Sequence, residues 1–295
     1  MKFKVMIVTA VTTICALIIA APTGAYVWPM IGGSQVEGDM IMPEIWLDGT
    51  IIRVSDEYWQ PWPVFGWSQS PFLRPLVEPN EFNPAAPWAV LTGKAYNWQY
   101  GWDSGLLNEY PPLGSDFWLK VLYQTPGLET YWGDSTYAPI FGTLDSQGNP
   151  TPDIWKWNMG MMHNVYAVPE SFYGRLFATY KIYIGDSTTG DELVDSNGQP
   201  IYQSTTVTFR WLRPCLYILQ GDLNADCIVD FLDFSIVTNQ WLDSTCTAPY
   251  WCDEADIGKT GAVNMNDFDL LSGKWLTDCH QTPSDPCCSP RPGPW

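Results

Sequence analysis

Histidine and basic residues are scarce in this sequence. Of its 295 residues only His163 and His280 are histidines, and 14 lysines and arginines stand against 32 aspartates and glutamates, a net charge of −18. A histidine-based catalytic triad would have to use one of these two rings, so that class of hydrolase has little support. Because the negative charge repels nucleic acids and anionic membrane surfaces, we expect neither as a partner.

Cysteine is absent from residues 26–214 and concentrated at the end of the chain. This boundary separates a larger domain without disulfides from a small module with a thin core, in which an exported protein is expected to form them. A zinc site is the alternative, but no paired Cys-x-x-Cys sets support it. Because the number is odd, one thiol stays free or pairs between chains. The cysteines of this region are Cys215, Cys227, Cys246, Cys252, Cys279, Cys287 and Cys288.

One long apolar run occurs, at residues 5–20, and no other follows it. Two lysines precede the run and small residues from Ala21 to Ala25 follow it, which is typical of a secretory signal peptide cleaved after Ala21 or Ala25. We therefore predict a signal peptide at residues 1–25, an extracellular or cell-surface location, and no membrane span in the mature chain. A single-pass anchor is the alternative, although the run is short for one.

Residues 26–213 show the pattern of short strands separated by turns. At residues 176–184 and again at 206–211, side chains of two sets alternate one by one along the chain. This period of two is typical of a β-strand. Turn-forming clusters rich in Asp, Ser, Asn and Gly separate the strands, and no long helical period occurs. The sequence therefore predicts a mainly β fold, a β-sandwich of immunoglobulin-like or jelly-roll type. Further strand candidates are residues 51–54, 88–91 and 117–122.

The same domain is rich in aromatic residues but has no catalytic motif. Residues 59–62 and 96–100 interleave aromatic with polar side chains, and sugar rings stack on exposed aromatic faces. A carbohydrate-binding surface is therefore one interpretation, and packing in the core is the other. Glycosidic hydrolysis needs two carboxylates about 5 to 10 Å apart, and no flanking motif selects such a pair. We assign no catalytic residue and favour a non-enzymatic domain over a polysaccharide-degrading enzyme.

Two twelve-residue segments near the C-terminus, residues 222–233 and 256–267, carry oxygen-bearing side chains at a common spacing. Calcium prefers six to eight oxygens, and an EF-hand-type loop supplies them at positions 1, 3, 5, 9 and 12 and from the backbone carbonyl of position 7. The predicted ligands of the first loop are Asp222, Asn224, Asp226, Ile228 through its carbonyl, Asp230 and Asp233. Those of the second loop are Asp256, Thr260, Ala262 through its carbonyl, Asn264 and Asp267.

The two loops differ in quality. The first has Cys227 where the sharp turn normally takes glycine, and a non-glycine residue at positive φ costs on the order of 1 kcal/mol. The second keeps Gly261 at the turn but has Gly258 and Thr260 at the third and fifth ligand positions. We predict tight calcium binding in the first loop and weak binding or none in the second.

An apolar triplet at helical spacing follows each loop. Two tandem calcium loops, each followed by one short helix, resemble a dockerin, and the resemblance covers residues 221–280. An acidic turn before an ordinary amphipathic helix is the alternative. The resemblance implies a cohesin-like or cell-surface partner, contacted through the residues just before the last calcium ligand. It also admits a glycoside hydrolase carried on a dockerin, with a polysaccharide as substrate. The apolar triplets are Phe234, Val237, Trp241 and Phe268, Leu271, Trp275, and the implied contact residues are Phe231, Leu232, Met265 and Asn266.

Disulfide pairing is partly open. Only five residues separate Cys246 from Cys252, so we expect this pair to bond. The antiparallel helices of a dockerin would bring Cys279 near Cys227 or Cys215, one of which it would pair with. We expect residues 214–220 to form a linker and residues 281–295 to form a disordered tail.

Overall fold

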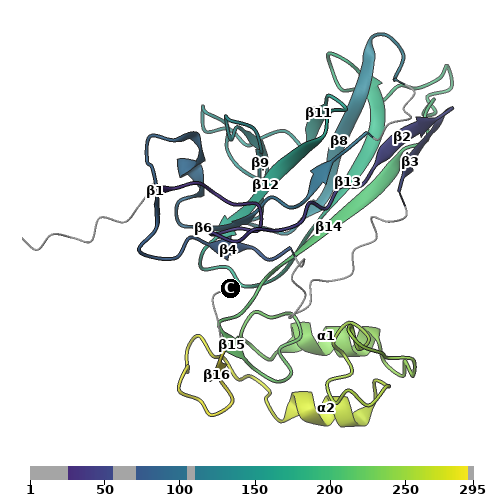
Figure 1. Cartoon of the computed structure of the whole chain (residues 1–295). Coiled ribbons are helices and arrows are strands. Elements are labelled where there is room, and N and C mark those ends of the chain that lie inside the picture. Colours follow the sequence, from purple (N-terminus) through teal and green to yellow (C-terminus); the bar gives the residue numbers. More distant parts are fainter. Residues whose placement is uncertain (1–25, 56–70, 105–109, 292–295) are drawn as a thin grey trace, which may run out of the picture.

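The strands from β1 (Tyr26–Val27) to β14 (Thr205–Arg213), here called the β domain, precede a small module with two helices at the C-terminal end of the chain (Figure 1). The computed structural model describes residues 26–55, 71–104 and 110–291. The predicted signal peptide, residues 1–25, and the aromatic stretch at residues 59–62 lie outside the described residues. Within the described ranges, no helix is both long and apolar enough to cross a membrane.

Four antiparallel strands form the first sheet, in the order β11 (Ile154–Trp157), β8 (Ser115–Gln124), β13 (Gly174–Asp186) and β14 (Thr205–Arg213). Along β13 buried side chains alternate with half-exposed ones, and Leu176, Ala178 and Tyr180 are fully buried. Successive side chains of a strand point to opposite faces, so β13 turns one face toward the core. The alternation predicted at residues 176–184 is confirmed.

The second sheet has more strands than the first, and most of them are shorter. Its order is β10 (Pro139–Phe141), β9 (Glu129–Trp132), β12 (Met162–Pro169), β6 (Lys94–Asn97) and β4 (Arg74–Pro75), with β7 (Gly101–Trp102) also paired to β12. Two further sheets have two strands each: β2 (Ile45–Asp48) pairs with β3 (Ile51–Val54), and β1 (Tyr26–Val27) pairs with β5 (Glu81–Phe82).

Aromatic side chains join the two sheets face to face. Tyr100 stacks on Phe209 of β14 with ring centroids 4.3 Å apart, and Tyr166 of β12 packs on Trp211 at 4.4 Å. These four rings are fully buried. Large aromatic side chains bury more apolar area than any others, so they dominate the stability of this core. The chain is therefore mainly β, with a β-sandwich as its larger domain.

One predicted strand is wrong. Residues 88–91 lie in η2, a 3-10 helix at Pro87–Leu91. Pro87 stands at the start of this helix, where its fixed φ and missing N–H are tolerated. A short apolar run does not by itself distinguish a strand from a helical segment, and here the preceding proline decides.

The C-terminal module is larger than the sequence suggested. It contains α1 (Phe231–Asn239) and α2 (Met265–Ser272), and also a small sheet in which β15 (Tyr217–Ile218) pairs with β16 (Ser289–Pro290). Leu219 is buried in the module core, and Arg291 Nε donates to the carbonyl of Cys215 at 3.1 Å. The predicted linker at 214–220 is therefore part of the module, and the predicted disordered tail is wrong for residues 281–291.

Three disulfides staple this module. Cys246 bonds Cys252, the pair that its short separation predicts. The predicted pairing of Cys279 with Cys227 or Cys215 is wrong, because the segments expected to be linker and tail fold back and supply nearer partners. The bonds formed are Cys215–Cys227 and Cys279–Cys288, with Cα atoms 5.2 and 5.6 Å apart. Cys287 is the free thiol of the described residues.

Candidate calcium and docking site

The first loop closes through hydrogen bonds from backbone amides to its first and last aspartates. Asp222 accepts from the amides of Asp226 and Cys227, both at 3.0 Å. Asp233 accepts from Leu223 at 2.6 Å and from Asp230 at 2.9 Å. These bonds bring the two ends of the loop together and gather its carboxylates around one point.

Three of these crowded carboxylates have raised pKa values. Burial, then the charges of Asp233 and Asp226, raise the pKa of Asp222 to about 8. Burial also raises the pKa of Asp233, to about 6, and that of Asp226. Like charges in one site disfavour ionisation unless a cation neutralises them. Asp230, the side chain of Asn224 and the carbonyl of Ile228 complete an all-oxygen donor set, which fits calcium.

The second loop repeats the backbone of the first. Asp256 accepts from the amides of Thr260 at 2.9 Å and Gly261 at 2.7 Å. Asp267 accepts from Gly258 and Asn264, both at 2.9 Å. The second loop therefore has the same frame, held by the same two positions.

The middle of the second loop is a poorer ligand set. Gly258 offers no side chain at the third ligand position. The carbonyl of Ala262, the expected seventh-position ligand, accepts from Asn264 Nδ2 at 3.2 Å and from Thr260 Oγ1 at 3.4 Å. This loop brings two carboxylates to a cation, Asp256 and Asp267, where the first loop brings four, which is the reason for the prediction of weak binding.

Both loops make the expected sharp turn at their sixth position. Gly261 has φ +94°, a conformation that glycine adopts freely. Cys227 has φ +74° at the equivalent place and bonds Cys215 from there. The strain expected of a side chain in this conformation, on the order of 1 kcal/mol, is offset by the disulfide.

The ninth and twelfth positions also begin the helices, a role that is not among the predictions above. Asp230 is the N-cap of α1 and forms a capping box with Asp233, and Asn264 with Asp267 does the same for α2. A residue of the Ser/Thr/Asp/Asn class followed three positions later by an acid is the sequence signal for this. Each loop is thus coupled directly to the first turn of its helix.

The predicted contact residues lie on these first turns and are exposed. Phe231 is 71% exposed, Leu232 58% and Met265 63%, and Asn266 is also exposed. All four therefore remain available to a partner at the starts of α1 and α2 (Figure 1).

An apolar groove between the two helices adjoins these residues. Its volume is about 400 Å³. Phe231 packs edge-on against Trp275 with centroids 5.0 Å apart, and Phe234 packs against Phe268 at 5.8 Å. The helical spacing indicated Phe234, Phe268 and Trp275 as an apolar stripe, but only the packing of the two helices shows that they also line a groove.

The β domain has a separate cavity of about 430 Å³. Trp98 and Trp132 line it together with the exposed Asp134 and Asn158. Of the aromatic residues at 96–100, Tyr96 and Tyr100 are fully buried in the core, so only Trp98 reaches this cavity.

His163 also lines this cavity. Its Nδ1 lies 2.9 Å from the Trp98 carbonyl. Burial lowers the pKa of His163, which keeps its ring neutral near pH 7. The ring therefore contributes a polar but uncharged surface to the lining of the cavity.

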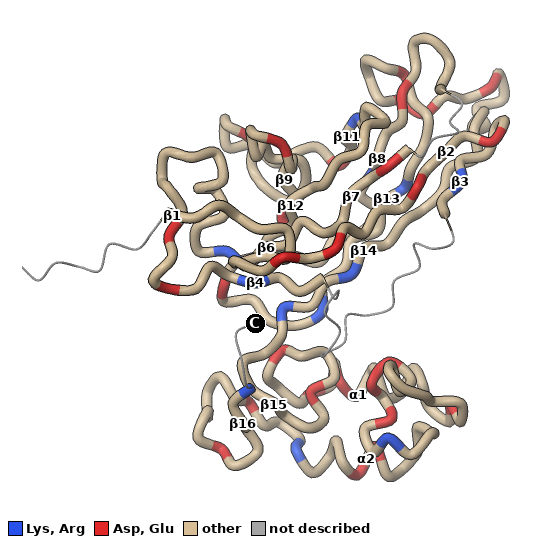
Figure 2. Tube along the Cα trace, viewed as in Figure 1, with Lys and Arg blue, Asp and Glu red and all other residues tan. Residues whose placement is uncertain are grey.

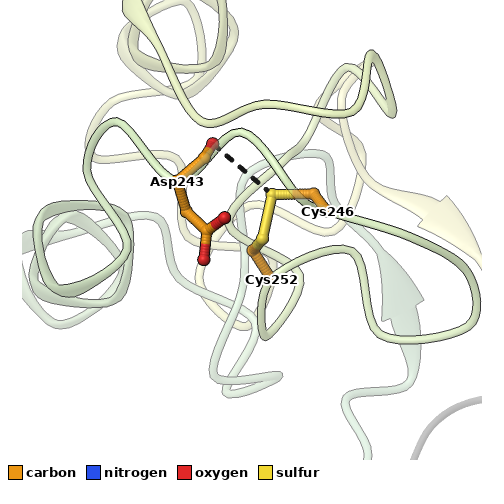
Figure 3. A group of neighbouring side chains, drawn as sticks. All are labelled: Asp243, Cys246 and Cys252. Atoms are coloured by element: carbon orange, nitrogen blue, oxygen red, sulfur yellow. Dashed lines mark hydrogen bonds between the residues drawn. A yellow bond between two sulfur atoms is a disulfide. The ribbon is translucent and has the colours of Figure 1, made fainter.

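Asp243, Cys246 and Cys252 form a compact cluster of potential metal ligands (Figure 3). Both sulfurs are used in the disulfide, and Asp243 accepts a hydrogen bond from the amide of Thr245 at 2.8 Å. A disulfide sulfur is not the thiolate that metals bind. This cluster is therefore a turn closed by a disulfide rather than a metal centre.

Comparison with known proteins places the module. Residues 220–274 match the dockerin type I domain family, and the C-terminal module is dockerin-like. No curated protein matches the chain. A solved chain from a type II cohesin–X–dockerin complex of Acetivibrio cellulolyticus is 12% identical, with 57% of this chain and 86% of that chain covered and a TM-score of 0.18. A TM-score this low supports no shared fold.

Proposed function

We propose that this protein is an exported docking protein whose dockerin-like module attaches the β domain to a cohesin-bearing or cell-surface partner. The observation that carries the proposal is the exposed apolar surface at the start of α1, formed by Phe231 and Leu232 beside the groove between α1 and α2; Met265 is exposed at the start of α2. Apolar side chains exposed together in this way are typical of protein-binding surfaces. The match of residues 220–274 to dockerins supports a cohesin as the partner.

Calcium in the first loop supports this surface. Asp222, Asn224, Asp226, Asp230, Asp233 and the carbonyl of Ile228 would hold the ion, which would neutralise the crowded carboxylates when bound. Asp230 accepts from the amide of Leu232 at 2.7 Å. The same residue would therefore bind the ion and position the first turn of the docking helix.

Binding to a panel of cohesin domains, measured by calorimetry in calcium, tests the docking surface. Leu232→Asp places a charge on the apolar surface and is expected to abolish binding. Ser284→Asp adds the same charge at an exposed position outside both helices and is the matched control. If Leu232→Asp keeps its circular dichroism spectrum and binds like the parent protein, the proposed surface is incorrect.

A second proposal concerns the β domain, which we infer contacts a neutral glycan through the cavity at Trp98 and Trp132. The indole rings offer apolar faces, and Asn158 and Asp134 offer polar groups at the rim, the combination that small-ligand sites commonly use. Titration with neutral cello-, xylo- and manno-oligosaccharides, followed by tryptophan fluorescence, tests it. Trp132→Ala should abolish the response, and Trp241→Ala in the module should not.

The enzyme alternative has weaker support. Asp134 is the one carboxylate among the described residues that line this cavity, whereas glycoside hydrolysis uses two. Glu78, Glu81 and Glu170 line another pocket, but all three are exposed, and a catalytic acid needs burial to hold its proton. A reducing-sugar assay on a polysaccharide panel decides the matter. Turnover that disappears with one of these carboxylates would establish an enzyme.

A further inference from the structure

The β domain contacts the module at its first calcium loop. Ala225, the fourth residue of that loop, is buried in a small apolar cluster with Phe72 and Leu212 of the β domain. Its carbonyl accepts from the amide of Cys215 at 3.1 Å. The loop therefore contributes a buried residue to the boundary between the domains.

The first residue of β13, Gly174, lies next to the predicted ligands of the same loop. A Cβ atom added to Gly174 would lie 3.4 Å from the Cβ of Asp226 and 3.5 Å from the carbonyl oxygen of Asn224. Gly174 has φ +116°, so this close approach is made at a position that only glycine adopts easily. Residues 224–226 therefore lie next to the start of β13, with room for about one methyl group between them.

A pair of rings packed at a tilt reinforces this contact. Tyr173 packs on His280 with centroids 4.8 Å apart, and His280 Nε2 lies 3.0 Å from the carbonyl oxygen of Asp226. The guanidinium of Arg213 lies over the same tyrosine ring, 4.6 Å from the centroid of Tyr173. The rings of Tyr173 and His280 together therefore connect the end of β14 to the calcium loop.

The connection is also covalent. β14 ends at Arg213, and Cys215, two residues later, bonds Cys227 at the turn of the loop. On the flank, Arg175 of β13 pairs with Asp253 of the module at 3.2 Å. Figure 2 shows several of the few basic residues on the side of the β domain that faces the acidic module.

We propose that the first calcium loop is also the joint between the two domains, and that calcium bound there fixes the orientation of the β domain relative to the docking helices. The residues that make the joint, from Asn224 to Cys227, are the same residues that carry the central ligands. Without a cation the carboxylates of Asp222, Asp226 and Asp233 repel one another, which loosens this segment and every contact that it makes. This proposal rests on calcium binding by the first loop and not on the identity of the docking partner.

Small-angle scattering of the mature full chain, with calcium alone as the probe, tests the joint. Calcium should reduce the maximum dimension and narrow the distance distribution relative to the protein in EGTA. Asp222→Ala should abolish this change, whereas Asp256→Ala, the matched substitution in the second loop, should preserve it. An identical scattering profile with and without calcium, while calorimetry shows calcium bound, would overturn the proposal.

A second variant separates the joint from the folding of the module. Tyr173→Ala combined with His280→Ala removes the ring contact and leaves every predicted calcium ligand in place. Calorimetry should then show unchanged calcium binding, while the scattering profile in calcium stays as broad as in EGTA. Tyr123→Ala, an exposed tyrosine on β8, is the control. A narrow profile for the double variant in calcium would show that these rings are not part of a joint, and absent calcium binding in the parent protein would refute the calcium site itself.

Discussion

The two loops of the module, residues 222–233 and 256–267, share one backbone design and differ in their chemistry. In both, the first and last aspartates accept amide hydrogen bonds that close the loop, as Asp222 and Asp256 show. The central positions diverge, because Asp226 of the first loop corresponds to Thr260 of the second. The terminal aspartates therefore maintain the fold of a loop, while the central residues decide whether it concentrates enough charge to hold a cation.

Their surroundings also differ. The first loop contacts the β domain through Ala225 and is tied to β14 through Cys215. The second loop packs within the module, where the amide of Cys246 donates to the carbonyl of Gly261 at 3.2 Å. The loop with the stronger ligand set is therefore also the one at the domain boundary.

Removing one terminal aspartate should have unequal consequences in the two loops. Asp222→Ala removes a carboxylate from the strong site and should lower calcium affinity roughly 100-fold, about 2.8 kcal/mol. Asp256→Ala should leave the affinity of that site unchanged. Isothermal calorimetry of both variants measures this, and equal losses would mean that the two loops bind calcium equally.

The disulfide at the first loop should stabilise the module by about 3 kcal/mol, according to the chain-entropy estimate for its loop length. Cys215→Ser with Cys227→Ser should therefore lower the free energy of unfolding by that amount. Cys215→Ser with Cys227→Gly should recover roughly 1 kcal/mol, because glycine adopts the positive φ of this position without strain. Chemical denaturation in calcium compares the two variants, and equal stabilities would show that Cys227 is not strained.

Restoring the central ligands should convert the second loop into a calcium site. A Cβ added to Gly258 would lie 3.3 Å from Thr260 Cγ2 and 3.5 Å from Asp267 Oδ1, so a side chain needs only a small adjustment there. Gly258→Asn with Thr260→Asp should raise the affinity of this loop roughly tenfold or more. Calorimetry should then resolve a second binding event. A titration indistinguishable from that of the parent protein would show that the central side chains are not what limits the second loop.

The caps of the two helices should give the smallest effect. Asn264→Ala removes the N-cap of α2 and should cost about 1 kcal/mol of module stability. This loss should be the same with and without calcium if the second loop binds none. Asp230→Ala should cost more in calcium than in EGTA, since Asp230 is both cap and predicted ligand. Thermal unfolding in the two buffers provides the measurement, and a calcium-dependent loss for Asn264→Ala would contradict weak binding by the second loop.

Local patterns in the sequence were reliable guides. The alternation at residues 176–184 and the spacing of both loops each describe residues a few positions apart, and the structure forms β13 and two similar loops there. The strand predicted at residues 88–91 failed because a run this short fits either a strand or a helical turn, and Pro87 favoured the helical one. The capping boxes were also readable from local spacing, but the same residues had already been assigned as ligands.

Short segments of the sequence specify the mainly β domain, the two loops and the helices that follow them, because each depends on periods and spacings between residues a few positions apart. Tertiary packing selects the partners of Cys215 and Cys279, the pairing of β15 with β16, and the contact of Ala225 with Phe72. These contacts join segments that come together only when the two sheets and the module have packed. The free energy that selects them is burial of apolar surface, which acts between whatever residues the fold brings into reach and leaves no local pattern in the chain.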